Sequence, residues 1–104
     1  MADTLLALSS PVRREILRMI WSDERPAGDI AKQFDVSWPA ISQNLRVLKD
    51  AGLIRERRSG TSRLYRADRA ALRPLEGYLR KMWASRIDRL RLLAEAEERN
   101  RSKR

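Results

Sequence analysis

The pattern of apolar and polar positions predicts three short helices in the first third of the chain. Apolar residues recur at helical spacing over residues 3–8, 12–21 and 29–34. Ser10 can accept a hydrogen bond at the start of the second helix, and Pro11 suits its first turn. Proline and glycine at 26–28 and a tight turn at 35–37 interrupt the pattern. The pattern therefore predicts helices joined by short loops.

A fourth helix, over residues 38–51, has the clearest boundaries in the chain. Ser37 can accept a hydrogen bond from its first turn, Pro39 is tolerated in that turn, and Gly52 can adopt the left-handed conformation that ends a helix. Its apolar residues share one face: Ile41, Leu45 and Leu48. The polar residues on the other side and its flank are Ser42, Gln43, Arg46 and Asp50. One face suits a core, and the other can reach outward.

The helices at 29–34 and 38–51, with the turn between them, match the helix-turn-helix pattern. In DNA-binding versions the second helix lies in the major groove, where polar side chains reach base edges and phosphates. A generic helical bundle with similar loops is the alternative, because periodicity alone does not separate the two.

Residues 53–67 predict a basic β-hairpin directly after this helix. Two short runs flank a glycine-containing turn at 59–62. The arginines on it are Arg55, Arg57, Arg58, Arg63 and Arg66, against the single acid Glu56. Such a hairpin can contact phosphates or the minor groove. The alternative is a solvated edge hairpin whose charge prevents aggregation.

Residues 69–98 predict one long amphipathic helix, with Pro74 in its first turn. A helix of some 25 residues spans about 37 Å, more than a small domain covers with its own core. The same helix of a second copy is therefore the expected partner. The alternative is a long helix that folds back onto its own domain.

The length indicates one domain over residues 1–104, which the pattern makes mainly α with a small β-hairpin, and the charge indicates a polyanionic partner. Lys and Arg number 23 against 14 Asp and Glu, which gives a formal net charge of +9. The chain has no Cys and no His, so thiol chemistry, imidazole zinc sites and Ser-His arrangements are excluded. We expect no enzyme activity and no metal or other cofactor. With no leader-like start and no apolar run of ~20 residues, we expect a cytosolic protein without a membrane segment.

Several local sequences together resemble the ArsR family of bacterial winged helix-turn-helix repressors. They are residues 8–17, 29–31, 37–54 and 63–66, in the family's order, and the resemblance covers roughly residues 5–95. It implies a homodimeric transcription regulator that binds an inverted repeat in double-stranded DNA. The recognition helix would be residues 38–51, the wing 53–67 and the dimerisation helix 69–98.

The resemblance also implies which residues act. DNA contacts are expected from Ser37, Trp38, Pro39, Ser42, Gln43, Arg57, Arg58, Thr61 and Arg63, and Arg46 is added because it lies on the outward face. Dimer contacts are expected from Leu5, Leu6, Leu79, Trp83, Ile87 and Leu90. Trp38 has the alternative of packing against its own domain, and Asn44 stands where many members have His. Arg13 and Arg14 are expected on the outside of their helix, as phosphate contacts or as solubilising charges.

The residues that metal-sensing members use are missing. Residues 26–30 hold no Cys, the last helix holds no His, and Asp88, Glu95 and Glu97 are expected to be solvated. Residues 82–90 resemble the non-metal branch that is often encoded beside a START-like protein. The sequence does not identify a small-molecule effector. Two other functions stay open: a winged-helix module that binds nucleic acid without sequence preference, and a protein-interaction adaptor.

Overall fold

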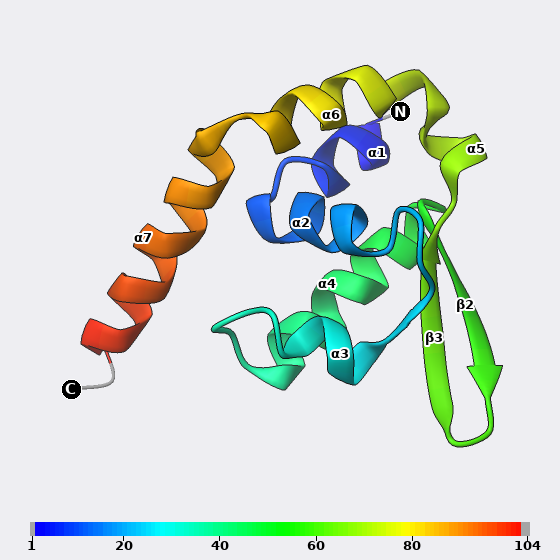
Figure 1. Ribbon diagram of the computed structural model, residues 1–104, viewed down its shortest axis with the longest axis horizontal. Coiled ribbons are helices and arrows are strands. Elements are labelled where there is room, and N and C mark those ends of the chain that lie inside the picture. The colour runs from blue at the N-terminus through cyan, green and yellow to red at the C-terminus, as the bar shows by residue number, and fades with distance from the viewer. Residues whose placement is uncertain (1, 103–104) are drawn as a thin grey trace.

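The computed structural model describes residues 2–102, which form a helical domain with one small sheet (Figure 1). The helices of the N-terminal half are α1 (Ala2–Ala7), α2 (Pro11–Met19), α3 (Ala27–Ala31) and α4 (Trp38–Asp50). The strands are β1 (Arg25–Pro26), β2 (Ile54–Ser59) and β3 (Ser62–Ala67), in the antiparallel order β1-β3-β2. The C-terminal elements are α5 (Arg69–Leu72), the 3-10 helix η1 (Arg73–Leu75), α6 (Glu76–Ala84) and α7 (Arg86–Ser102).

The helix boundaries follow local capping chemistry. Ser10 and Ser37 each accept a backbone N–H hydrogen bond at 3.3 Å at the start of α2 and α4. Gly52 has φ +75°, so it takes the left-handed conformation after α4 that side chains disfavour. The predicted start and end of the recognition helix are therefore confirmed.

The hairpin is also confirmed, and a third strand joins it. β2 and β3 pair from Ile54 with Ala67 to Ser59 with Ser62, and Gly60 in the turn has φ +61°. β1 pairs with β3 at Tyr65, although the sequence predicts only a break near Pro26. Proline lacks the N–H that a central strand needs, and β1 lies at the sheet edge, where this is tolerated.

One core joins the N-terminal helices, the sheet and the start of the C-terminal segment. Its fully or nearly fully buried members are Ala7, Leu8, Val12, Ile16, Leu17, Met19, Ile20, Trp21, Ile30, Ile41, Leu45, Leu48, Leu53, Ile54, Tyr65, Ala67, Leu72 and Leu79. The inner faces of α2 and α4 supply most of the helical part. Among the described residues, no buried side-chain polar atom lacks a hydrogen-bond partner.

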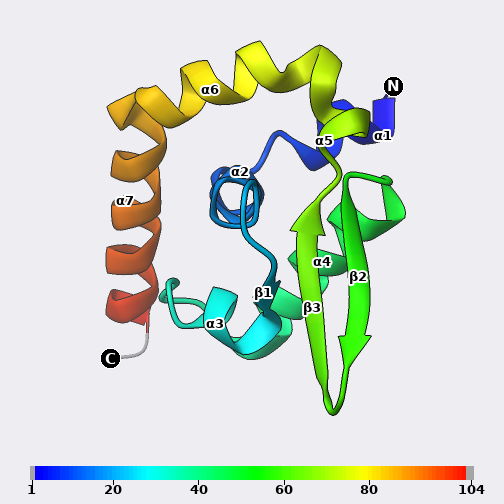
Figure 2. The same ribbon diagram turned by 45° about the vertical axis from the view of Figure 1, so that its right-hand side comes forward.

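The prediction of one continuous helix over 69–98 is wrong. The chain bends at η1, which contains Pro74, and again at Ser85, whose backbone is extended at φ −78° and ψ 140°. Proline disrupts the helical ladder in the first case. In the second, the Ser85 hydroxyl accepts the N–H of Ile87 at 3.1 Å, so α7 begins anew. Figure 2 shows the resulting arch of α6 and α7 around α2.

Two residues that were predicted to contact a second copy, Leu79 and Trp83, pack within their own chain instead. Leu79 is fully buried in the core, so its place in a dimer interface is corrected. Trp83 is half-buried: its indole N–H donates to the Arg14 carbonyl at 2.9 Å, and its ring meets Trp21 edge-on at 5.3 Å. The alternative prediction, a C-terminal helix that folds back onto its own domain, is therefore correct for α6. Other predicted contacts, Leu5, Leu6, Ile87 and Leu90, are exposed.

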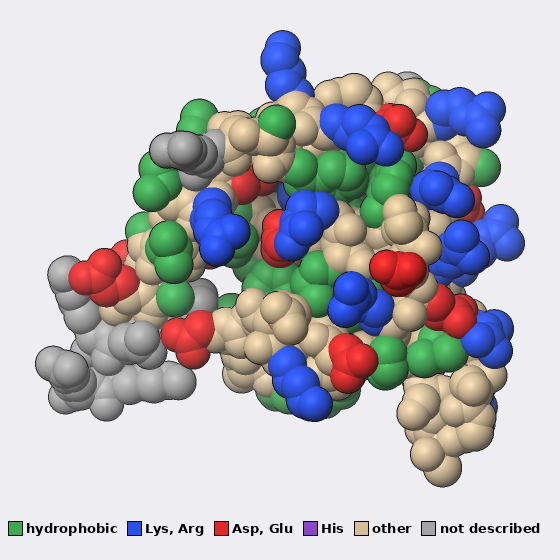
Figure 3. Space-filling view, viewed as in Figure 1, with side chains coloured by type: hydrophobic (Ala, Val, Ile, Leu, Met, Phe, Trp, Pro, Cys, Tyr) green, Lys and Arg blue, Asp and Glu red, His purple; other side chains and the backbone are tan. Residues whose placement is uncertain are grey.

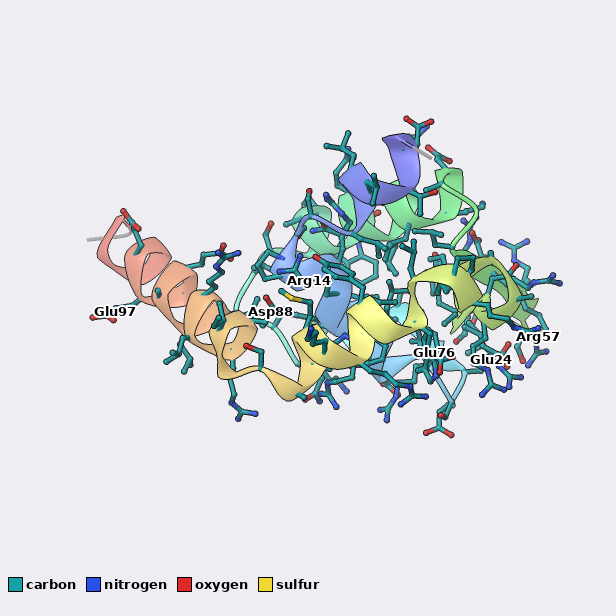
Figure 4. The ribbon with its side chains drawn as sticks, turned by 90° about the horizontal axis from the view of Figure 1, so that it is seen from above. Arg14, Glu24, Arg57, Glu76, Asp88 and Glu97 are labelled. Carbon is teal, nitrogen blue, oxygen red and sulfur yellow. The ribbon has the colours of Figure 1, made fainter. Side chains whose placement is uncertain are left out.

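Arg14 and Asp88 form a buried ion pair between α2 and α7, which corrects the expectation that both are solvated. The guanidinium donates to the two carboxylate oxygens at 2.6 and 2.7 Å and to the Leu8 carbonyl at 2.6 Å, and Arg14 is 2% exposed. The hydrogen bond to Asp88 raises the pKa of Arg14 above its ordinary value. Figure 4 shows the two side chains pointing toward each other. The pair anchors α7 on α2.

Beyond this anchor, α7 stands away from the body of the domain. An open cleft of about 970 Å³ separates it from the turn after α3, with Phe34, Gln33 and Leu92 in its lining. Within residues 2–102 no group of His, Cys, Asp and Glu is arranged to hold a metal ion. In the same residues, no helix has the length and apolar character needed to cross a membrane.

Candidate nucleic-acid interface

The recognition helix α4 turns one face into the core and the other to solvent. Ile41, Leu45 and Leu48 are buried against α2 and α3, which fixes the rotation of the helix about its axis. The opposite side and the first turn carry exposed side chains: Ser37, Trp38, Pro39, Ser42, Gln43 and Arg46. All six predicted contact residues of this helix are thus on one accessible surface.

Trp38 lies at the exposed start of α4. This residue is 54% exposed, so a large part of it remains accessible to a ligand. Ser37 accepts the N–H of Ala40, and its own hydroxyl hydrogen stays available as a donor. The first turn of α4 therefore offers an aromatic ring and a hydroxyl donor to a ligand.

Asn44 is turned away from this surface. Its side-chain N–H donates to the Ala40 carbonyl at 2.8 Å, and its side-chain oxygen accepts a hydrogen bond from Arg13 at 3.0 Å. Both polar ends of the side chain are thus engaged within the protein. A contact from Asn44 to a base would require at least one of these hydrogen bonds to break.

The wing carries the remaining predicted contacts, and all four, Arg57, Arg58, Thr61 and Arg63, are exposed. Two of them are ion-paired: Arg57 with Glu24 at 2.6 Å and Arg63 with Glu56 at 3.0 Å. Within the described residues, Arg58 makes no ion pair. The wing therefore presents both paired and unpaired cations.

The sequence did not predict that acidic side chains pair with the arginines of the wing. The hydrogen bond from Arg57 lowers the pKa of Glu24, and that from Lys49 lowers the pKa of Glu56, with Arg63 adding to the second effect. Lys49 on α4 contacts Glu56 on β2 at 2.8 Å, so this carboxylate joins the recognition helix to the wing. Glu56 was visible as the one acid of the hairpin. Glu24 lies 33 positions before its partner and gave no local signal.

The start of α4 and the turn of the hairpin both lie in the lower half of the molecule as drawn in Figure 1. In Figure 1, α4 begins beside α3 in the lower half, and the hairpin turn lies at the lower edge. Figure 3 shows Lys and Arg side chains across this view, most densely along the edge over the hairpin and α5, with acidic side chains between them. In winged helix-turn-helix proteins an outward helix contacts a groove and a basic hairpin contacts the adjacent phosphates.

Comparison with known proteins decides the family. Residues 8–57, from just before α2 into β2, match the family described as Helix-turn-helix domain. The chain is 34% identical over 91 residues to the HTH-type transcriptional regulator Rv2034 of Mycobacterium tuberculosis, covering 88% of this chain and 85% of that protein. This chain belongs to the ArsR family of winged helix-turn-helix regulators. As a member, it is a DNA-binding transcriptional regulator and not an enzyme.

Two further proteins extend the comparison. The transcriptional repressor SdpR of Bacillus subtilis is 42% identical over 60 residues, covering 58% of this chain and 67% of that protein. A solved ArsR-type neighbour from Mycobacterium bovis has a TM-score of 0.69 and 27% identity, covering 85% of this chain and 82% of that chain. That neighbour is described as a homodimeric winged helix-turn-helix DNA-binding domain and a possible ArsR-family transcriptional regulator.

Proposed function

We propose that two copies of this ArsR-family chain bind an inverted repeat in duplex DNA and repress transcription by covering a promoter. The exposed polar face of α4 is the observation that carries this proposal, because its buried inner face fixes the direction in which its polar residues point. The repressor role is supported by the named repressor among its relatives. Such a regulator acts in the bacterial cytoplasm, where the DNA lies.

The recognition helix supplies base readout. Gln43 can donate and accept on adenine, Ser42 can bond either bases or phosphates, and Arg46 can bond guanine or a phosphate. Ser37, Trp38 and Pro39 lie at the start of the helix, where the N-terminal dipole favours an adjacent phosphate. Each good bidentate pair between a side chain and a base discriminates by about 1–3 kcal/mol.

The wing supplies sequence-independent affinity. Arg58 and Thr61 can contact phosphates directly, whereas Arg57 and Arg63 exchange Glu24 and Glu56 for phosphate oxygens. Because Arg57 and Arg63 are exposed in their ion pairs, this exchange costs little. The affinity for DNA is therefore expected to fall steeply as the salt concentration rises, because the release of counterions from the DNA becomes less favourable.

The dimer contacts come from apolar side chains that the chain itself leaves uncovered. Leu5 and Leu6 on α1 and Ile87 and Leu90 on α7 are all more than half exposed, and Leu93 on α7 joins them from the structure. A homodimeric neighbour of the same fold supports this assembly. In a two-fold dimer the two recognition helices are expected about one DNA turn apart, roughly 34 Å.

Selection from random DNA tests the proposal. Duplexes enriched by the protein are compared with scrambled duplexes by fluorescence anisotropy across a salt series. We expect preference for the selected sequence on the order of a hundredfold or more at physiological salt. Equal binding to both duplexes would contradict the proposal and leave a module without sequence preference.

Two variants of glutamine residues test whether the outer face of α4 reads the base sequence. Gln43→Ala is expected to lower the preference by about tenfold, because it removes a bidentate partner of one base. Gln33→Ala is the matched control: Gln33 is exposed but lines the cleft beneath α7 instead of the outer face of α4. The control is expected to leave the preference unchanged.

A further inference from the structure

One guanidinium in the described structure connects the end of α1 to the recognition helix. Arg13 donates from Nε to the Ala7 carbonyl at 2.6 Å and from one terminal nitrogen to the Leu6 carbonyl at 3.1 Å. Its other terminal nitrogen donates to Asn44 Oδ1 at 3.0 Å, across 31 positions of the chain. A single half-buried side chain thus holds two elements that are distant in the sequence.

The two ends of this bridge belong to different functions. Leu6 and Ala7 close the last turn of α1, where backbone carbonyls lack partners within the helix; the Leu6 carbonyl also accepts the N–H and the hydroxyl of Ser9, at 3.2 and 2.6 Å. On the same turn, the Leu6 side chain is 68% exposed and points away from the core. At the other end, Asn44 follows directly after Ser42 and Gln43 and is itself tied to the Ala40 carbonyl.

We propose that Arg13 is a positioning residue that sets the angle of the recognition helix relative to α1, and thereby the half-site spacing that the dimer accepts. The inference rests on the proposed function, since it needs two copies on two half-sites. Through this bridge, the direction of α4 depends on the position of α1, the helix that is expected to contact the second copy. Asn44 serves this bridge instead of reading a base.

The chemistry of the bridge requires arginine. The planar guanidinium directs three donors in fixed directions, and all three acceptors that it meets here are neutral oxygens. A lysine ammonium carries the same charge but is a compact donor that cannot span three separated acceptors in one plane. Arg13→Lys therefore removes the geometry of the bridge and keeps the charge.

The test measures spacing preference. Selected half-sites are placed in duplexes that differ by single base pairs in separation, beside a duplex with one half-site, and affinities are measured by anisotropy. For the wild-type chain, the best spacing is expected to be bound about tenfold more tightly than its neighbours. Arg13→Lys and Asn44→Ala are expected to reduce this ratio to about threefold or less, with binding to the single half-site unchanged within about twofold.

Two controls separate positioning from general stability. Asn44→Asp keeps an oxygen acceptor for Arg13, so it is expected to retain the spacing ratio even if its overall affinity changes. Arg18→Lys, on the exposed side of α2 and paired with Glu15, is expected to behave as wild type. Thermal melting of each variant confirms that it is folded.

The outcomes are distinct. Equal weakening at every spacing and on the single half-site would overturn the positioning role, because a merely structural defect lowers all affinities alike. Retention of the wild-type ratio by Arg13→Lys and Asn44→Ala would also overturn it. A wild-type chain that prefers no selected duplex over a scrambled one would instead defeat the proposed function, and the positioning role with it.

Discussion

The recognition helix α4 and the C-terminal helix α7 each carry a row of apolar side chains, but only the row on α4 is buried by its own chain. The stripe of α4, Ile41, Leu45 and Leu48, is buried within its own chain. The stripe of α7, Ile87, Leu90 and Leu93, remains more than half exposed. The packing of α4 is complete within its own chain, whereas the exposed apolar side chains of α7 support the proposal that this helix contacts a second copy.

The polar residues of the two helices show the reverse arrangement. The outward side chains of α4, such as Gln43 and Arg46, are exposed and available to a ligand. On α7, Asp88 is buried against Arg14, and Leu92 packs partly on the core from the same side. In α4 the apolar face is structural and the polar face is the one proposed to contact DNA, whereas the buried side of α7 relies on an ion pair to hold it in place.

The largest expected effect comes from breaking the anchor of α7. Arg14→Ala leaves the Asp88 carboxylate buried without its partner, and the free energy of unfolding is expected to fall by about 3–5 kcal/mol. Urea denaturation measures it. The exposed pair of Arg18 with Glu15 provides the control, since Arg18→Ala is expected to cost less than about 1 kcal/mol. Similar costs for the two variants would contradict a buried anchor.

Truncating one leucine on each helix tests the comparison itself. Leu45→Ala is expected to lower the free energy of unfolding by about 2–5 kcal/mol, because it opens a cavity in the core. Leu90→Ala is expected to change it by no more than about 0.5 kcal/mol at protein concentrations where single copies dominate. Comparable losses would show that α7 is as well covered by its own chain as α4.

A charge on the exposed stripe of α7 tests the interface. Leu90→Asp is expected to raise the dissociation constant of the dimer by about thirtyfold or more, since it places a carboxylate where an apolar contact is expected. Sedimentation equilibrium without DNA measures it. Glu95→Lys changes the charge on another side of the same helix and is expected to have little effect. An unchanged dissociation constant for Leu90→Asp would move the interface elsewhere.

The smallest effect concerns the carboxylate that joins α4 to the wing. Lys49 and Arg63 lower the pKa of Glu56, so the folded state binds its proton more weakly than the unfolded state. The stabilisation is therefore present above the ordinary glutamate pKa and is lost as the pH falls through and below it. Urea midpoints at decreasing pH are expected to fall less for Glu56→Gln than for the wild type. Parallel curves would show that this carboxylate does not contribute.

Local chemistry made the recognition helix and the hairpin predictable. Ser37 and Gly52 mark the ends of α4 through hydrogen bonding and backbone conformation that depend only on neighbouring residues. The contact residues on α4 followed from its periodicity together with the family resemblance, and the structure exposes all of them. Their contact with DNA stays a prediction.

The errors arose where distant residues decide the structure. Arg14 and Asp88 lie 74 positions apart, so nothing local indicated that an arginine of α2 would be buried. The bend at Ser85 had a local signal: Ser85 and Asp88 have the spacing of a helix capping box. The apolar periodicity on both sides obscured it. Leu79 is buried in the core because the chain bends at η1, and the apolar periodicity did not predict this bend.

The mass of the complex on a selected inverted repeat tests the central claim most directly. Sedimentation of wild-type protein with duplex is expected to show the duplex plus two chains of 12.1 kDa, without a populated species containing one chain. Leu90→Asp is expected to populate the one-chain complex at the same protein concentration. A wild-type complex with one chain per duplex would contradict the account. So would a Leu90→Asp protein that assembles two chains as readily as the wild type.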